Sequence, residues 1–170
     1  GILGEVFNAV LTALAFTESD IHKLLLDAIQ LIPADSEYFS VISFAWNCCK
    51  ECMDWHEALY RCQKRYKKYN WIHAYPNACC EVIALYYGEG DYAKTLHIVT
   101  MCGIDADCNA GMIMPILAIQ KGMGIIPKKL IHPAFEELIT YMRGTEKLSL
   151  EELVDDTLNS IIHAKNKEEV

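Results

Sequence analysis

The sequence has no hydrophobic run long enough to cross a membrane. Its longest apolar stretch, Met112 to Ile119, is well short of the roughly 20 residues that a membrane helix needs. It also has little positive charge: 15 Lys and Arg stand against 23 Asp and Glu, which gives a formal net charge of -8. A general nucleic-acid-binding protein carries a basic face. These two absences therefore argue against membrane and nucleic-acid partners.

The chain also lacks the features of a disordered protein and of a secretory leader. Hydrophobic residues make up 52% of it, which is enough to fill a sizeable core. No basic segment or small-residue cleavage site is present near its start. Instead an amphipathic helical pattern begins at Ile2 without a cap, and Gly1 stands where an initiator Met is expected. We therefore expect residues 1–170 to be a single segment cut from a longer polypeptide.

Eight cysteines are many for this length, and two pairs are adjacent in sequence. The pairs are Cys48-Cys49 and Cys79-Cys80. Both fall in helical patterns, without the loop-rich spacing of a small disulfide-stapled scaffold. We therefore expect reduced, mostly buried thiols in a cytoplasmic protein. A zinc site at Cys49 and Cys52 would need two further ligands, and His56 is the only nearby candidate, so zinc is not favoured.

Helix signals follow one another with short connections. Asp or Ser residues stand ahead of most apolar segments with helical period, where they are expected to cap the helices. The expected caps are Thr17, in a capping box with Asp20, then Asp35 or Ser36, Asp54, Asp91 and Ser149. One further helix is expected from Pro133 to Tyr141. No stretch alternates apolar and polar residues over the length of a strand, so the sequence predicts an all-α fold of roughly eight or nine helices.

The segment from Gly103 to Gly111, with the sequence GIDADCNAG, carries the most chemical information. Asp105, Asp107 and Asn109 stand at alternate positions between the end of one expected helix and the start of the next. Alternate positions in an extended turn direct several oxygen atoms to one place, as a hard divalent cation requires. The alternative is that the two aspartates only cap the next helix. The spacing alone does not decide between these two interpretations.

Two other acidic patterns fit metal binding poorly. A calcium loop of the EF-hand type needs Gly at its sixth position and Glu at its twelfth, where this sequence has Ala110 and Ile116. Asp155-Asp156-Thr157 has a suitable composition, but it falls on the polar side of an amphipathic helical segment. Neither pattern is favoured over the Asp105 segment.

Four sequence blocks occur in a characteristic order. They are Tyr75-Pro76-Asn77-Ala78, Ala84-Leu85-Tyr86-Tyr87-Gly88-Glu89-Gly90-Asp91-Tyr92, the GIDADCNAG segment, and Gly124-Ile125-Ile126-Pro127. Together they resemble the C-terminal half of the ADP-ribosylglycohydrolase family, which includes dinitrogenase-reductase-activating glycohydrolase. The resemblance spans roughly Gly1 to Ile162. It implies a multi-helix orthogonal bundle that forms the C-terminal portion of the family's domain, with the N-terminal half absent.

The resemblance also implies a metal site. Members bind two Mg²⁺ or Mn²⁺ ions between an N-terminal Thr-Asp-Asp-type cluster and a C-terminal Asp-x-Asp-Thr motif. Asp105 and Asp107 match the two aspartates of the second motif, so the resemblance assigns them as metal ligands and catalytic residues. Cys108 stands where many members have Thr and is the expected third metal contact. A thiol is a softer and poorer ligand for Mg²⁺ than a hydroxyl.

The implied reaction is metal-assisted hydrolysis, in which a carboxylate serves as base or acid. Members cleave the bond between ADP-ribose and an acceptor such as arginine or serine, or hydrolyse related ADP-ribosyl compounds. The expected partners are therefore an ADP-ribosylated protein or a small ADP-ribosyl compound, and the missing N-terminal half of the same polypeptide. Asn77, Gly103 and Asn109 are the expected substrate contacts, although Asn77 also fits a solvated helix start.

One acidic cluster cannot hold two ions. We therefore expect residues 1–170 alone to be inactive. The alternative is a truncated or degenerate helical module that binds ADP-ribose or a protein without turnover.

Overall fold

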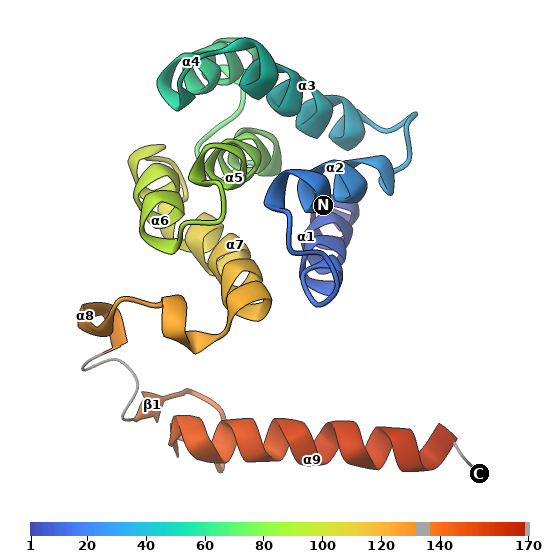
Figure 1. Ribbon diagram of the computed structural model, residues 1–170, viewed down its shortest axis with the longest axis vertical. Coiled ribbons are helices and arrows are strands. Elements are labelled where there is room, and N and C mark those ends of the chain that lie inside the picture. The colour runs from blue at the N-terminus through green and yellow to red at the C-terminus, as the bar shows by residue number, and fades with distance from the viewer. Residues whose placement is uncertain (132–136, 169–170) are drawn as a thin grey trace. The chain divides into compact units, whose positions relative to one another are not determined.

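The computed structural model describes residues 1–131 and 137–168, and the chain separates into two units, Gly1–Ile125 and Ile126–Val170. Helices make up the first unit (Figure 1). They are α1 (Ile2–Leu14), α2 (Ile21–Gln30), α3 (Glu37–Glu51), α4 (Trp55–Tyr66), α5 (Ala74–Gly88), α6 (Tyr92–Met101), α7 (Ala106–Lys121) and the short 3-10 helix η1 (Met123–Ile125). The expected multi-helix bundle is confirmed.

Side chains cap the start of four of these helices. Three of the caps are as predicted, whereas α2 is capped by Asp20 rather than by Thr17 of the predicted capping box. Asp20 and Asp54 each accept two backbone N–H bonds from the first turns of α2 and α4. Ser36 accepts from the backbone N–H of Phe39, and Asp91 accepts from that of Lys94. These bonds satisfy amide groups that the helix itself leaves without partners. The helix starts are therefore fixed by local sequence.

Helix α5 lies at the centre of the first unit and packs against α2, α3, α4, α6 and α7. Every residue from Asn77 to Leu85 is buried, so the helix is covered on all sides. At its end the chain approaches α6 closely, because a Cβ atom added to Gly88 would meet the Thr95 side chain and backbone. This central position brings the start of α5 next to the start of α7.

The cysteines are buried as expected, with one exception. Seven of the eight are buried and unpaired, and Cys108 is exposed. Burial raises the pKa of the Cys49 thiol, which keeps it protonated and unreactive. Cys49 therefore acts as a small apolar side chain.

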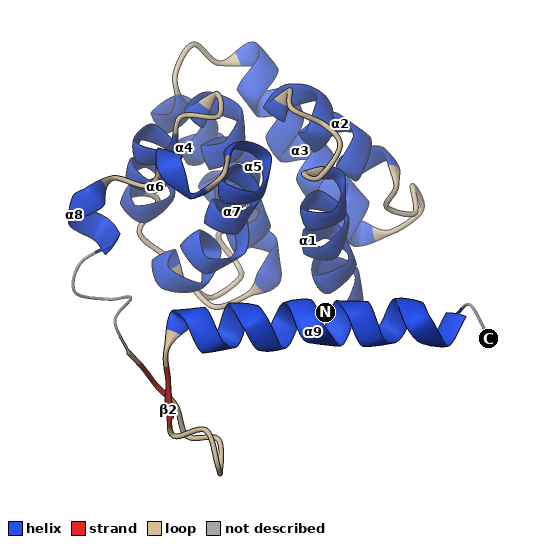
Figure 2. Cartoon of the chain, turned by 60° about the horizontal axis from the view of Figure 1, so that its bottom comes forward, coloured by secondary structure: helices blue, strands red, loops and turns tan. Residues whose placement is uncertain are grey.

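The second unit contains α8 (Lys128–Ile131), a hairpin of β1 (Leu138–Ile139) and β2 (Lys147–Leu148), and α9 (Leu150–Glu168) (Figure 2). The helix predicted from Pro133 to Tyr141 is wrong where the structure describes it, because Leu138 and Ile139 pair with β2. Gly144 adopts a positive φ of 86° in the connecting turn, which allows the chain to reverse. Residues 133–136 of the predicted helix lie outside the described residues.

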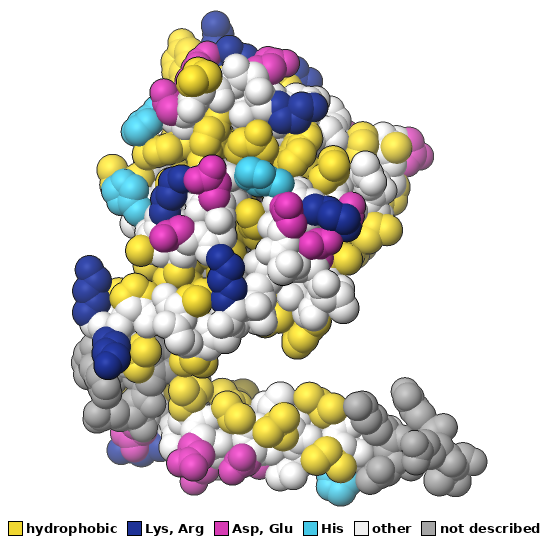
Figure 3. Space-filling view, in the orientation of Figure 1, with side chains coloured by type: hydrophobic (Ala, Val, Ile, Leu, Met, Phe, Trp, Pro, Cys, Tyr) yellow, Lys and Arg dark blue, Asp and Glu magenta, His cyan; other side chains and the backbone are white. Residues whose placement is uncertain are grey.

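The capping box predicted at the start of α9 is confirmed. Glu152 N–H donates to Ser149 Oγ at 3.1 Å, and Ser149 N–H donates to the Glu152 carboxylate at 3.0 Å. Five large apolar side chains of α9 are exposed, from 39% at Leu153 to 55% at Ile162, and apolar side chains form a row along the helix (Figure 3). None of the described helices is both long enough and apolar enough to span a membrane.

Candidate metal and ligand site

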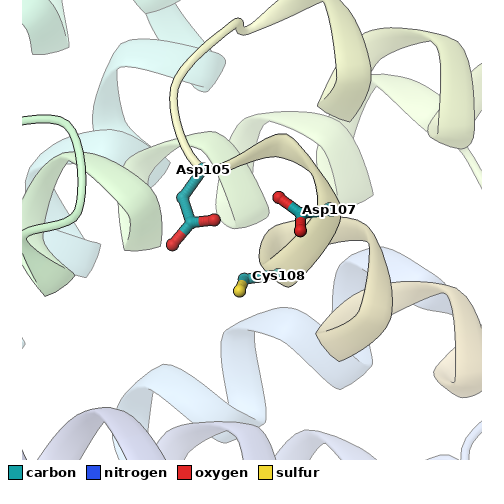
Figure 4. A group of neighbouring side chains, drawn as sticks. All are labelled: Asp105, Asp107 and Cys108. Carbon is teal, nitrogen blue, oxygen red and sulfur yellow. The ribbon is translucent and has the colours of Figure 1, made fainter.

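The GIDADCNAG segment forms the junction between α6 and α7. Gly103 follows the last turn of α6 with a positive φ of 76°, a conformation that glycine adopts without strain. Asp105 occupies the N-cap position of α7, and Asp107 and Cys108 lie in its first turn (Figure 4). The turn and the helix start therefore place all three candidate metal ligands at one end of α7.

Asp105 stands at a capping position but does not cap. Its side chain accepts no hydrogen bond from the amides of α7, in contrast to Asp20 and Asp54 at their helix starts. Instead the ligand atoms of Asp105, Asp107 and Cys108 all lie within 4.8 Å of one another. Capping therefore does not account for Asp105, and the two carboxylates share one small region of space.

The Cys108 thiol is the unusual member of this group. A hydrogen bond to Asp105 and the negative charges of Asp105 and Asp107 raise the pKa of the thiol. The thiol therefore stays protonated near neutral pH, which makes it a weak ligand for a hard cation. The carboxylate oxygens fit Mg²⁺ or Mn²⁺, whereas the third position fits less well.

Asn77 connects α5 to the start of α7. Its Oδ1 accepts hydrogen bonds from the Asn109 Nδ2 at 2.7 Å and from the Asp105 backbone N–H at 3.3 Å. Its Nδ2 donates to the carbonyl oxygens of Trp71 at 2.8 Å and His73 at 3.0 Å. Both Asn77 and Asn109 are buried, so the interpretation of Asn77 as a solvated helix start is wrong. The pair fixes the backbone from which the Asp105 carboxylate projects.

A cavity of about 200 Å³ lies beside this junction, between α1, α3, α5 and α7. Asn77, Asp105, Cys108 and Asn109 are among its lining residues. Asp107 and Gly103 do not line it: Asp107 is exposed on the first turn of α7, and Gly103 forms the turn before it. The structure thus brings four of the six predicted site residues to one cavity and leaves the other two beside it.

One carboxyl group in the same cavity is not among the residues that the sequence predicts for the site. Glu81 lies one turn after Asn77 on α5, is only 5% exposed and lines the cavity. Burial raises the pKa of Glu81 to about 8, although a hydrogen bond with Asn8 opposes this effect. A charged residue within the apolar run from Ala78 to Leu85 was the available signal.

The cavity is acidic. Glu5, Glu81 and Asp105 line it, and no Lys, Arg or His is among the described residues of its wall. Such a wall favours cations and hydrogen-bond donors over phosphate groups. Its chemistry is compatible with a divalent ion at Asp105 and Asp107 and with a polar ligand next to it.

The comparisons with known proteins gave one match. A family model described as ADP-ribosylglycohydrolase matches residues 1–167. No curated protein and no solved structure matches the chain.

Proposed function

The chain belongs to the ADP-ribosylglycohydrolase family, and on this premise we propose that it contributes the Asp-x-Asp part of a metal-dependent site. The reaction is hydrolysis of the N- or O-glycosidic bond between ADP-ribose and an acceptor. The observation that carries the proposal is the Asp105 carboxylate, which stands at a helix start without capping it and lies beside Asp107. The substrate is an ADP-ribosylated protein or a small ADP-ribosyl compound.

We assign Asp105 and Asp107 as ligands of Mg²⁺ or Mn²⁺, with Cys108 as a third contact. Members of the family typically depend on metal ions, and carboxylate oxygens are the ligands that these cations prefer. A bound divalent ion supplies polarisation of water and of ligand oxygen atoms. The complete site takes two ions, so it requires the family's Thr-Asp-Asp-type cluster in addition to residues 1–170.

The chain's own residues position the reacting groups. Asn77 holds the backbone at Asp105 and the side chain of Asn109, which keeps the Asp105 carboxylate at the cavity wall. A carboxylate of the Asp105 and Asp107 pair accepts the proton of the attacking water. Asn77, Gly103 and Asn109 remain our candidates for substrate contacts, with the two amides the better placed because both line the cavity.

A second candidate function is binding of ADP-ribose without turnover. The observation that favours it is Cys108, whose protonated thiol is a weaker metal contact than the Thr of the family motif. The two functions are separated by a turnover assay on a polypeptide that carries both the Thr-Asp-Asp-type cluster and the Asp105–Asp107 pair. Release of ADP-ribose would favour hydrolysis. Binding of ADP-ribose without its release from any ADP-ribosylated substrate would favour the second.

The variant Asp107→Ala tests the first function in a polypeptide that carries both clusters. We expect release of ADP-ribose from an ADP-ribosylated protein, measured with Mg²⁺ or Mn²⁺, to fall about a hundredfold or more, because a metal ligand is lost. Asp107 is exposed, so circular dichroism should show an unchanged fold. Asp35→Ala, an exposed carboxylate outside the cavity, is the matched control. Unchanged turnover of the Asp107 variant refutes the assignment.

A further inference from the structure

Two buried hydrogen-bond acceptors in the acidic cavity have no partner among the described residues. They are Oε2 of Glu81 on α5 and Oδ1 of Asn8 on α1. The Asn8 Nδ2 donates to the carbonyl oxygen of Gly4 at 3.3 Å, and the Asn8 side chain also forms a hydrogen bond with Glu81, so only the two oxygen atoms named above lack partners. Buried acceptors without donors destabilise a fold, and native proteins contain few of them. Both residues line the cavity, so a ligand that enters it can supply the missing donors.

The position of Glu81 is costly for stability. Its neighbours on α5, Cys80 and Val82, are buried and apolar, and Glu81 itself is 5% exposed. Tyr38 of α3 also lines the cavity, but its hydroxyl is not a hydrogen-bond partner of the unpaired oxygen. A buried carboxyl group without a full set of partners is typical of a functional site rather than of a core.

The charge of the cavity limits what the ligand group can be. With Glu5 and Asp105 in the same wall, and no basic side chain among its described residues, the cavity repels a phosphate. The amide oxygen of Asn8, and the Glu81 carboxyl group in its ionised form, instead require N–H or O–H donors. Ribose hydroxyls and the guanidinium of an arginine side chain both offer pairs of such donors.

We propose that Glu81 and Asn8 form a subsite that binds a hydrogen-bond-donating group of the ligand, either ribose hydroxyls or a guanidinium. The proposal rests on the proposed function, which brings an ADP-ribosyl compound to this cavity. It adds two binding residues that lie outside the Asp-x-Asp motif and on different helices from it.

Calorimetric titration of the full-length protein tests the subsite with two probes, ADP-ribose and L-arginine methyl ester. We expect Glu81→Leu to weaken the binding of one probe at least about tenfold, as the loss of a hydrogen bond to a carboxyl group should. Because Leu removes an unpaired polar group, thermal unfolding should show a variant no less stable than the wild type. Asn8→Ala gives the same result if the Glu81 variant does not fold.

Glu81→Gln identifies the source of the donors, with Asp35→Asn as its matched control. The amide keeps a carbonyl acceptor but cannot ionise beside a bound guanidinium as a carboxyl group can, so binding of ADP-ribose through hydroxyls is largely retained, whereas binding of the arginine ester is lost. If ADP-ribose does not bind, the proposed function is refuted. The subsite is still supported in that case if binding of the arginine ester is weakened by Glu81→Leu. If neither probe binds, or both bind Glu81→Leu and Asn8→Ala as tightly as the wild type, the subsite is refuted.

Discussion

Cys108 is the residue at which the candidate metal group differs from the Asp-x-Asp-Thr motif. The hydrogen bond to Asp105 and the charges of the two aspartates raise the pKa of its thiol. A neutral thiol offers a soft, weakly basic sulfur to an ion that prefers oxygen. In the proposed site the carboxylates of Asp105 and Asp107 would therefore supply most of the affinity for Mg²⁺.

Replacing Cys108 with Thr should improve Mg²⁺ binding. The hydroxyl is a harder ligand, and the substitution at this exposed position should leave stability within about 0.5 kcal/mol. We expect affinity for Mg²⁺, measured by calorimetry in a polypeptide with both clusters, to rise several-fold, and Cys108→Ala to bind no better than the wild type. A folded Cys108→Thr protein that no longer binds the ion would mean that the thiol has another role.

Sequence patterns predicted the residues of the junction but not the whole cavity wall. Asp105, Asp107 and Asn109 are close in sequence, so their spacing alone suggested a shared site. Glu81 is separated from them by a helix and a turn, and it looks like an ordinary polar residue until the burial of α5 is known. Its role depends on tertiary packing, which no local pattern reports.

At the level of elements, the contact between α5 and α7 holds the candidate site together. Asn77 uses both ends of its amide, with Asn109 and Asp105 on one side and the backbone of the preceding turn on the other. Each of these bonds is local to the junction of the two helices. Their loss should therefore affect both the stability of the fold and the orientation of Asp105.

Asn77→Ala should lower the free energy of unfolding by about 2–4 kcal/mol, because it leaves the buried Asn109 amide without its acceptor. Urea denaturation gives this value, and Mn²⁺ titration should show weaker binding. Asn77→Asp keeps an acceptor for Asn109 but sets a buried carboxylate oxygen against the carbonyl oxygens of Trp71 and His73, so it should not restore the stability. Asn47→Ala, at an exposed amide of α3, is the control and should stay within about 0.5 kcal/mol. If Asn77→Ala lowers the free energy of unfolding by no more than Asn47→Ala does, the bridging role of Asn77 is contradicted.

Helix boundaries set by local chemistry were predictable, and those set by distant pairing were not. Asp20, Ser36, Asp54 and Asp91 cap helices because each accepts N–H bonds from residues two or three positions ahead. The segment that includes Leu138 was predicted as a helix from its apolar residues. It forms a strand because it pairs with β2 across a turn, a contact that apolar spacing does not reveal.

For the molecule as a whole, the net charge of -8 conceals one carboxyl group that should be uncharged near neutral pH in the folded state. Surface carboxylates such as Glu18 and Asp54 have lowered pKa values because Lys23 and backbone amides stabilise their charged forms. Burial has the opposite effect on Glu81 and raises its pKa to about 8. The surface carboxylates and Glu81 therefore affect folding stability in different ranges of pH.

The pKa of Glu81 predicts that the protein loses stability as pH rises from about 5 to about 8. An exposed Glu in the unfolded chain titrates near 4.5, so between 4.5 and about 8 the folded state binds more protons than the unfolded state. Raising the pH then ionises the buried group at a cost on the order of 3 kcal/mol. The depressed carboxylates act below this range, where their stabilisation is lost as the pH falls toward their folded pKa values.

Glu81→Gln removes this titration while keeping the size of the side chain. Urea denaturation at about pH 5, 6.5 and 8 should therefore show a steeper fall in stability for the wild type than for the variant, whereas Asp35→Asn should follow the wild type. Parallel curves for wild type and Glu81→Gln would mean that Glu81 is charged in the folded protein. A cation within the cavity would then have to compensate its charge, because no described basic side chain lines the wall.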